Sequence, residues 1–207
     1  MRALLLGATG LVGREILRLL AAEPACERVI VLARRALPEP PAKAVVHVVD
    51  FEHLERSGSL FGADAVFCAL GTTMRQAGTR ERFRAVDFGY PLAAARLARE
   101  RGARHFLLVS ALGASARSRV FYNRVKGELE DAILALGFPG VTIVRPSLLL
   151  GEREAFRLGE RLMMPLGVLV PRRWRPVQAR AVAAVLVQAS IHGAPGVRVI
   201  ESSQISQ

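Results

Sequence analysis

Hydrophobic and polar positions follow two alternating patterns along this chain of 207 residues. Short, almost wholly apolar runs are bounded by glycine, proline or charged residues, as buried parallel strands are. Longer stretches between them repeat their apolar positions every three to four residues, as amphipathic helices do. The patterning therefore predicts strands and helices in alternation.

The short runs predict strands at Ala3–Leu6, Arg28–Ala33, Val45–Val49, Asp64–Leu70, Ala103–Ser110, Val141–Arg145 and Val197–Ile200. The longer stretches predict helices at Leu11–Ala22, Thr79–Arg101, Val120–Leu136 and Gln178–Ile191. Pro91 interrupts the second helix and is expected to bend it, and Gly137 closes the third. This order predicts an α/β fold, a doubly wound parallel sheet of about seven strands with helices on both faces.

Nothing in the composition divides the chain, so residues 1–207 are expected to form one domain. The regular pattern loosens between residues 151 and 176, where arginines gather with Met163, Met164 and Trp174. We expect residues 151–176 to be a small C-terminal segment that covers the substrate.

A glycine-rich turn at residues 7–13, G-A-T-G-L-V-G, joins the first strand to the first helix. Gly7 permits the tight turn, Gly10 lets the backbone approach a pyrophosphate, and Gly13 lets the helix pack closely on the sheet. The N-terminus of the helix adds unpaired N–H groups and a positive dipole end. The pattern favours a dinucleotide site, although its spacing is only moderately specific and a turn that binds nothing is the alternative.

Arg34 and Arg35 follow the second strand, where dinucleotide-binding units meet the adenosine ribose. An arginine there pairs with the 2′-phosphate of NADP, whereas NAD needs an acidic residue, and the nearest one, Glu39, lies in a proline-rich connector. NADPH is therefore preferred over NAD, with a solvent-facing arginine pair as the alternative. Asp50 ends the third strand and can accept from an adenine amino group, and Gly71–Thr73 fit the crevice at the strand ends.

Tyr122 and Lys126 stand four residues apart in a predicted helix and so share one face. A nearby cation stabilises a phenolate, which makes a tyrosine a usable proton donor. Ser110, at the end of the preceding strand, can orient the same carbonyl by a hydrogen bond. The three residues predict a catalytic set, and an aromatic–cation pair on a helix surface is the alternative.

The net charge is +11, with 27 arginines and only two lysines, Lys43 and Lys126. Lysine at position 126 is therefore informative, because a compact ammonium can bridge ribose hydroxyls and a tyrosine where a planar guanidinium does not fit. The arginines are spread over the whole chain without an accompanying nucleic-acid motif. A nucleic acid is not expected as the main partner.

Cys26 and Cys68 form no C-x-x-C pair and are expected to be reduced and structural. Four scattered histidines give no metal-ligand spacing, so no metal site is expected. No apolar run is long enough to span a bilayer, and the N-terminus does not read as a signal peptide. We therefore expect no membrane association and a cytoplasmic location.

Several motifs occur together in a known order: G-A-T-G-L-V-G (7–13), V-V-D-F-E (48–52), C-A-L-G-T-T (68–73), H-F-L-L-V-S-A-L-G-A (105–114), F-Y-N-R-V-K-G-E-L-E (121–130) and R-P-S-L-L-L-G-E-R (145–153). With these motifs the chain resembles the short-chain dehydrogenase/reductase superfamily in its extended or atypical branch. More narrowly, it resembles the Tat-interacting-protein-like group of atypical NADPH-binding reductases. The resemblance runs from about residue 2 to residue 205.

The resemblance implies a Rossmann fold with NADPH along the strand ends. It assigns the pyrophosphate to Gly7, Thr9, Gly10, Leu11, Val12 and Gly13, the 2′-phosphate to Arg34 and Arg35, and the adenine to Asp50 and Phe51. It implies that the dinucleotide is lined by Leu70, Gly71, Thr72 and Thr73, that Lys126 contacts the nicotinamide ribose, and that the nicotinamide side is formed by Pro146, Ser147 and Leu148. Ser110 and Tyr122 would be the catalytic pair.

These observations predict an NADPH-dependent oxidoreductase that reduces a carbonyl-like small molecule, with Tyr122 as the proton donor. The alternative is an NADPH-binding redox sensor or scaffold that acts through a regulatory protein partner without turnover. A homodimer is compatible with the resemblance, because long helices often build dimers in this superfamily. One departure concerns Asp87, where many extended members have asparagine, because a carboxylate cannot donate a hydrogen bond as an amide does.

Overall fold

The computed structural model describes residues 1–150, 174–193 and 195–205. Within these residues, a seven-stranded sheet has the order β3-β2-β1-β4-β5-β6-β9, and all its neighbours are parallel. The strands are β1 (Arg2–Leu6), β2 (Arg28–Ala33), β3 (Ala44–Val48), β4 (Ala65–Cys68), β5 (His105–Val109), β6 (Gly140–Arg145) and β9 (Gly196–Glu201). The predicted α/β fold with a parallel sheet of about seven strands is confirmed.

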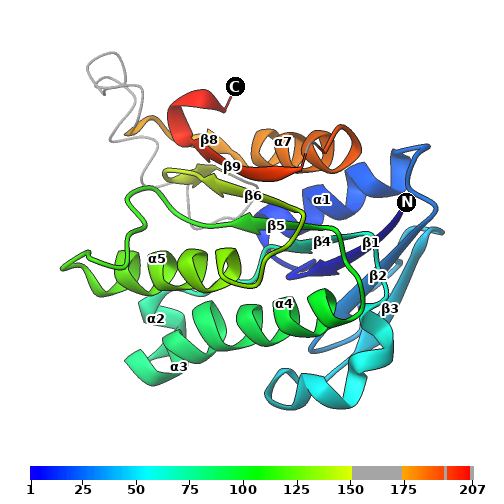
Figure 1. Ribbon diagram of the computed structural model, residues 1–207, viewed down its shortest axis with the longest axis horizontal. Coiled ribbons are helices and arrows are strands. Elements are labelled where there is room, and N and C mark those ends of the chain that lie inside the picture. The colour runs from blue at the N-terminus through cyan, green and yellow to red at the C-terminus, as the bar shows by residue number, and fades with distance from the viewer. Residues whose placement is uncertain (151–173, 194, 206–207) are drawn as a thin grey trace.

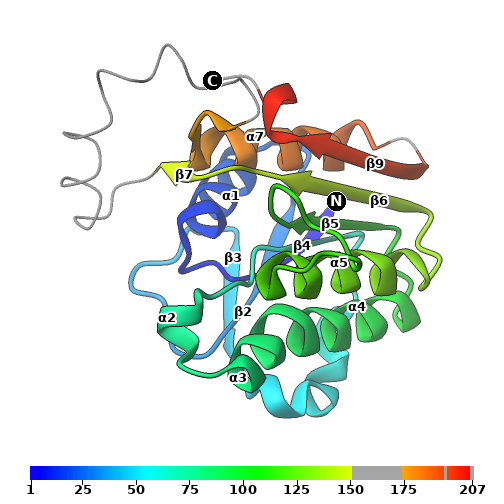
Figure 2. The same cartoon turned by 90° about the vertical axis from the view of Figure 1, so that its left-hand side faces the viewer.

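Helices cover both faces of the sheet (Figure 1). One face packs against α1 (Leu11–Ala22) and α7 (Ala179–Ile191). The other packs against α4 (Tyr90–Glu100), α5 (Phe121–Leu134) and a 3-10 helix, η1 (Phe51–Phe61). In both views α4 and α5 run side by side on this second face (Figure 2).

Burial on both faces explains why the strands are apolar at successive positions. In β1, Ala3 and Leu5 belong to the core on the side of α1 and α7, while Leu4 and Leu6 belong to the core on the side of α4 and α5. All four side chains are fully buried. An amphipathic strand with one polar face could not occupy this central position.

The predicted helix at Thr79–Arg101 is divided in the structure. A short helix, α3 (Arg80–Arg84), is followed by one turn of π-helix, η2 (Ala85–Gly89), and then by α4. Pro91 lies at the start of α4, where the helical backbone continues from η2 through Gly89 and Tyr90. The departure from regular α-helix is therefore a π-turn just before the proline, and it contains the fully buried Asp87.

Among the described residues, the structure adds elements that the patterning did not predict: η1, a helical turn α2 (Met74–Ala77), a pair of two-residue strands, β7 (Leu149–Leu150) with β8 (Val177–Gln178), and a 3-10 turn η6 (Ser202–Gln204). Strand β4 is shorter than predicted, and the backbone of Ala69 and Leu70 that follows it lies close to Gly7. The predicted covering segment 151–176 lies outside the described residues except for 174–176.

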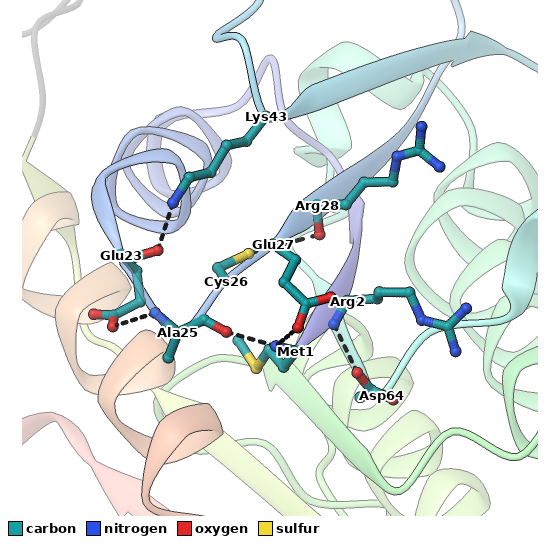
Figure 3. Close-up of polar contacts among 9 residues, drawn as sticks. All are labelled: Met1, Arg2, Glu23, Ala25, Cys26, Glu27, Arg28, Lys43 and Asp64. Carbon is teal, nitrogen blue, oxygen red and sulfur yellow. Dashed lines mark hydrogen bonds and ion pairs between the residues drawn. The ribbon is translucent and has the colours of Figure 1, made fainter.

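Polar contacts close the edge of the sheet at the amino ends of the strands (Figure 3). The Arg2 N–H donates to Asp64 Oδ2 at 2.6 Å, which joins β1 to the residue before β4. Lys43 Nζ donates to the carbonyl oxygen of Glu23 at 2.7 Å, just beyond α1. One of the two lysines is thus a structural contact at this edge, and the other, Lys126, lies at the opposite one.

Candidate functional site

The candidate site lies where β1 stands between β2 and β4, because the strand order reverses there: β2 and β3 extend the sheet on one side of β1, and β4, β5 and β6 extend it on the other. Open α/β sheets bind ligands at the carboxyl ends of the strands at such a switch point. The glycine turn follows β1, the arginine pair follows β2, and residues 70–73 follow β4. The structure therefore brings these three predicted segments to one edge of the sheet.

Backbone atoms occupy the space beside Gly7 and Gly13. Gly7 has φ +86°, and a Cβ there would lie 2.4 Å from the carbonyl oxygen of Ala69. A Cβ on Gly13 would lie 2.0 Å from the carbonyl oxygen of Gly7, so neither position accepts a side chain. Within the described residues α1 has no side-chain cap and no acidic residue in its first turn. Its first N–H groups therefore suit an anion such as a pyrophosphate.

The other predicted turn residues differ in how they can contribute. Thr9 is exposed, Gly10 and Leu11 are half-buried, and the Val12 side chain is 4% exposed and belongs to the core of the α1 face. Val12 can therefore offer its backbone N–H to a phosphate but not its side chain. The structure fits the predicted cradle as a backbone site.

Arg34 and Arg35 are exposed immediately after β2. Neither forms an ion pair with any other residue that the structure describes. Two guanidinium groups side by side at this strand end, without an ion-pair partner among the described residues, are suited to a phosphate dianion.

Asp50 and Thr73 each begin a helix. Asp50 Oδ1 accepts the N–H of Glu52 at 2.9 Å, and Thr73 Oγ1 accepts the N–H of Gln76 at 3.1 Å. Each of the two side chains therefore has a structural role as the N-cap of the helix that follows it. Their contacts with adenine and the dinucleotide stay predictions.

Phe51, predicted beside the adenine, is 6% exposed. Its ring packs against Tyr90 with 5.7 Å between centroids, and Tyr90 Oη donates to Glu52 Oε1 at 3.5 Å. Burial, with the neighbouring Glu52 carboxylate, raises the pKa of Tyr90. Phe51 thus belongs to the core on the α4 side of the sheet, and its contact with adenine stays a prediction.

Tyr122 and Lys126 occupy the same side of α5, as their spacing predicts. The Lys126 side chain is 5% exposed, and its Nζ lies 2.7 Å from Asp87 Oδ1. A Cβ on Gly71 would lie 3.5 Å from the same Nζ, so the ammonium lies against the loop that follows β4. The Tyr122 ring packs on the buried Phe83 of α3 with 5.4 Å between centroids.

The charge of Lys126 is stabilised inside the protein. Burial by itself would lower the pKa of Lys126, but the Asp87 carboxylate, with a smaller contribution from Tyr122, outweighs burial, and the pKa of Lys126 is raised. An ammonium at this place is therefore present throughout the neutral range.

Ser110 lies at the predicted strand end but is engaged in the interior. It is 5% exposed, and its hydroxyl donates to Oε1 of Glu130, which is 3% exposed. Glu130 in turn accepts from Arg145 Nε at 3.1 Å and from Arg145 Nη2 at 2.6 Å. These bonds, with a further one that Arg145 Nη1 donates to Glu201 Oε1, raise the pKa of Arg145. Because Glu130 is ion-paired with Arg145, its carboxylate oxygen accepts the hydrogen bond from the Ser110 hydroxyl.

The predicted nicotinamide residues Pro146, Ser147 and Leu148 connect two parts of the chain. The Ser147 hydroxyl donates to the carbonyl oxygen of Arg175, and the Ser147 N–H donates to Ser202 Oγ at 3.2 Å. Pro146 is buried, whereas Leu148 is 57% exposed. Of the three, Leu148 presents its side chain outward.

Sequence reasoning missed Phe83, Glu130 and Arg145, and it did not foresee that Asp87 contacts Lys126. Glu130 stands four residues after Lys126 and eight after Tyr122, so helical spacing already places all three on one face. Its partner Arg145 ends β6, far along the chain, and no local pattern signals that contact.

A family model described as NAD(P)H-binding matches residues 7–191. The chain belongs to this family. The match includes the glycine turn, the arginine pair and the Tyr122–Lys126 pair, so the segments that converge at the switch point belong to one NAD(P)H-binding unit.

Curated relatives cover nearly the whole chain. Protein FMP52, mitochondrial, of Eremothecium gossypii is 37% identical over 99% of this chain and 96% of its own length. Protein HTATIP2 of Rattus norvegicus is 37% identical over 88% of this chain and 76% of its own length. The similarity to HTATIP2 agrees with the resemblance drawn from the motifs.

The cytoplasmic location expected from the sequence is contradicted by these comparisons. The relatives from Eremothecium gossypii, Candida albicans and Scheffersomyces stipitis are named as mitochondrial proteins. That expectation rested on the absence of a recognised targeting pattern, and such an absence carries little information about location.

Solved structures share the fold at low sequence identity. UDP-glucose 4-epimerase of Thermotoga maritima superposes with TM-score 0.74 and 15% identity, over 98% of this chain and 77% of that one. The Bordetella bronchiseptica enzyme WbmG, in complex with NAD, gives TM-score 0.72 and 16% identity, over 98% and 73%. These likenesses support the Rossmann-like architecture.

The described residues contain no group of three or more histidine, cysteine, aspartate or glutamate side chains placed to hold a metal ion. No helix in the described ranges is long and apolar enough to cross a membrane.

Proposed function

We propose that this protein is an NADPH-dependent oxidoreductase of the short-chain dehydrogenase/reductase type. It reduces a carbonyl-like small molecule, and Tyr122 donates the proton. The family supports NAD(P) binding and an oxidoreductase-like fold, and the choice of NADPH, the reaction and the role of Tyr122 are our inferences from the geometry.

The observation that carries the proposal is the position of the Tyr122–Lys126 pair. It faces the loop after β4 at the switch point of the sheet, where the buried ammonium lies against Gly71. A phenol next to a permanent ammonium at the end of a dinucleotide crevice is an arrangement for proton transfer. A helix-surface pair without chemistry would not place a lysine side chain at 5% exposure.

The preference for NADPH is supported by Arg34 and Arg35. Both are exposed at the end of β2, and Glu39, the nearest downstream acidic residue, is too far along the chain to take the place of a ribose-binding carboxylate at that strand end. The cradle of Gly7, Gly13 and the α1 N-terminus would hold the pyrophosphate, and Lys126 would reach the ribose next to the nicotinamide.

A bound reduced nicotinamide supplies the hydride that the chain itself cannot supply. The chain's own residues bind and orient the substrate, and Tyr122 Oη gives its proton to the substrate oxygen as that oxygen gains charge. Lys126 stabilises the phenolate that remains. Solvent then returns a proton to Tyr122.

The experiment that tests the proposal follows NADPH consumption by the full chain with a panel of aldehydes, ketones and quinones. Tyr122→Phe should lower turnover by roughly 100-fold or more, the usual contribution of a general acid, while NADPH fluorescence still reports binding close to that of the parent. Equal turnover by the parent and the variant would remove Tyr122 from the reaction.

One observation favours a second candidate function, an NADPH-binding sensor that acts through a protein partner without turnover. The Ser110 proton is directed to Glu130 and not to a substrate oxygen. A protein that binds NADPH tightly but consumes none with any member of the panel would fit this second function.

A further inference from the structure

Asp87 is an ionisable group with no exposed surface, and it lies in the single π-turn of the described chain. Turns of this kind widen a helix by one residue and often occur at functional sites. Here the π-turn directs the side chain into the protein toward the loop after β4. Among the described residues, Asp87 Oδ1 is the buried side-chain oxygen without a hydrogen-bond partner of good geometry.

Two contacts hold the carboxylate. Asp87 Oδ2 accepts the N–H of Thr72 at 2.8 Å, and Asp87 Oδ1 lies 2.7 Å from Lys126 Nζ. A Cβ on Gly71 would lie 3.4 Å from Asp87 Oδ1 and 3.5 Å from Lys126 Nζ. One carboxylate thus connects the loop expected along the dinucleotide with the lysine expected at the nicotinamide ribose.

Three titratable groups face the Lys126 ammonium from the elements around it: Asp87 from η2, Tyr122 from its own helix and Cys68 from β4. Burial raises the pKa of Cys68 to about 11, so its thiol is neutral at pH 7. The fixed charges at this place are therefore one ammonium and one carboxylate. They sum to zero beside the Tyr122 phenol.

We propose that Asp87 is a positioning residue that acts as the counter-ion of Lys126 and sets the charge that Tyr122 experiences. The inference rests on the proposed function and adds to it how the charges around Tyr122 affect its proton. A phenol beside a neutral ion pair keeps its proton more firmly than a phenol beside a lone ammonium. The pair thereby keeps Tyr122 protonated in the resting site, so that the proton needed for reduction is held there, although a lone ammonium would make the phenol the stronger acid.

The competing explanation is that the Asp87–Lys126 pair only supports folding. Removing one partner of a buried pair is destabilising, so loss of activity in a variant would not separate the two explanations. The test therefore reads the ionisation of Tyr122 directly and needs neither substrate nor cofactor.

The chain has only two tyrosines, Tyr90 and Tyr122. In a Tyr90→Phe background, phenolate absorbance of the folded full-length protein reports Tyr122 alone, because tryptophan does not titrate in this way. We would measure this absorbance against pH for the background protein and for Asp87→Asn, Lys126→Met and the double variant. Circular dichroism at each pH shows that the protein is still folded.

The charges predict an ordered series. Asp87→Asn leaves the ammonium uncompensated, so the phenolate should form at least about one pH unit lower, a tenfold change in the ionisation constant. Lys126→Met leaves the carboxylate uncompensated and should move phenolate formation to higher pH. The double variant should return close to the background protein. If Asp87→Asn does not fold, Lys126→Met and the double variant still test the proposal. The double variant removes both charges and so leaves no buried charge unpaired.

The outcomes separate this proposal from the proposed function. If Lys126→Met shifts phenolate formation but Asp87→Asn does not, or if the double variant behaves like Lys126→Met, Asp87 is not the counter-ion and its role is structural. If no variant shifts it, Tyr122 and Lys126 do not interact, and the proposed catalytic pair fails as well. If all three variants shift phenolate formation as predicted, the result supports both the role of Asp87 as counter-ion and the Tyr122–Lys126 pair of the proposed function.

Discussion

Ser110 donates its hydroxyl proton to Glu130, a buried carboxylate that stands on the same face of α5 as Tyr122 and Lys126. A serine hydroxyl has one proton, so Ser110 cannot donate to a substrate oxygen at the same time. It can still accept a hydrogen bond. In this arrangement Ser110 can act as an acceptor, and the proton donor of the proposed function is Tyr122.

This relationship predicts unequal effects of two substitutions on turnover. Ser110→Ala should lower kcat/KM by less than about tenfold, whereas Tyr122→Phe should lower it by roughly 100-fold or more. Both variants are compared on the same substrate under the same conditions. If Ser110→Ala were as damaging as Tyr122→Phe without loss of stability, Ser110 would have to release Glu130 during the reaction.

The two carboxylates that contact Arg145 should differ in their contribution to stability. Glu130 has a side chain 4% exposed, and Glu201 has one 41% exposed, yet both lie within 2.8 Å of the same guanidinium. Glu130→Gln should lower the free energy of unfolding by about 2–4 kcal/mol, because it breaks a buried pair. Glu201→Gln is the matched control and should cost less than about 1 kcal/mol. Urea denaturation measures both, and equal losses would contradict this ranking.

Arg34 should determine the preference between NADPH and NADH. Arg34→Ala should weaken NADPH binding at least about tenfold, about 1.4 kcal/mol, and leave NADH binding nearly unchanged, because only NADPH carries the 2′-phosphate. Arg28 is an exposed arginine at the amino end of the same strand, so Arg28→Ala is the matched control. Fluorescence titration gives the four affinities. Equal losses in both arginine variants would indicate a general effect of net charge.

Gly13 should tolerate no side chain. Gly13→Ala places a Cβ 2.0 Å from the carbonyl oxygen of Gly7 and should abolish nucleotide binding by displacing α1 or the turn. Gly62→Ala is the control, since nothing lies within 4 Å of a Cβ there and its φ is −76°. Binding and thermal unfolding of both variants check this, and wild-type binding by Gly13→Ala would mean that the turn is not the cradle.

Stability should decrease in alkaline solution through Cys68. Burial raises the pKa of its thiol from 9.0 to about 11, so the unfolded chain loses this proton first as the pH rises. The protonated Cys68 thiol contributes roughly 3 kcal/mol to the free energy of unfolding. This contribution is complete below about pH 9 and is lost progressively up to about pH 11. Urea denaturation from pH 8 to pH 11 should show a shallower decrease for Cys68→Ala than for the parent. The same slope in both would contradict a buried neutral thiol.

The order of strands and helices could be predicted because each depends on local repetition. The bounds of α1 and β2 match the prediction residue for residue, since an amphipathic stretch or a doubly buried strand is defined by its own composition. The long helix before β5 was predicted less well. A π-turn changes the helix by one residue, and no local pattern distinguishes it from a regular turn before Pro91.

The sequence by itself determined the α/β class, the glycine turn, the arginine pair after β2 and the shared face of Tyr122 and Lys126, because each follows from spacing within one segment. Only the tertiary structure decided that Asp87 lies against Lys126, that Glu130 accepts the Ser110 hydrogen bond and that Arg145 pairs with Glu130. These contacts join side chains from different elements across the sheet edge. Charge pairing between distant segments depends on how those elements pack, and local periodicity carries no information about it.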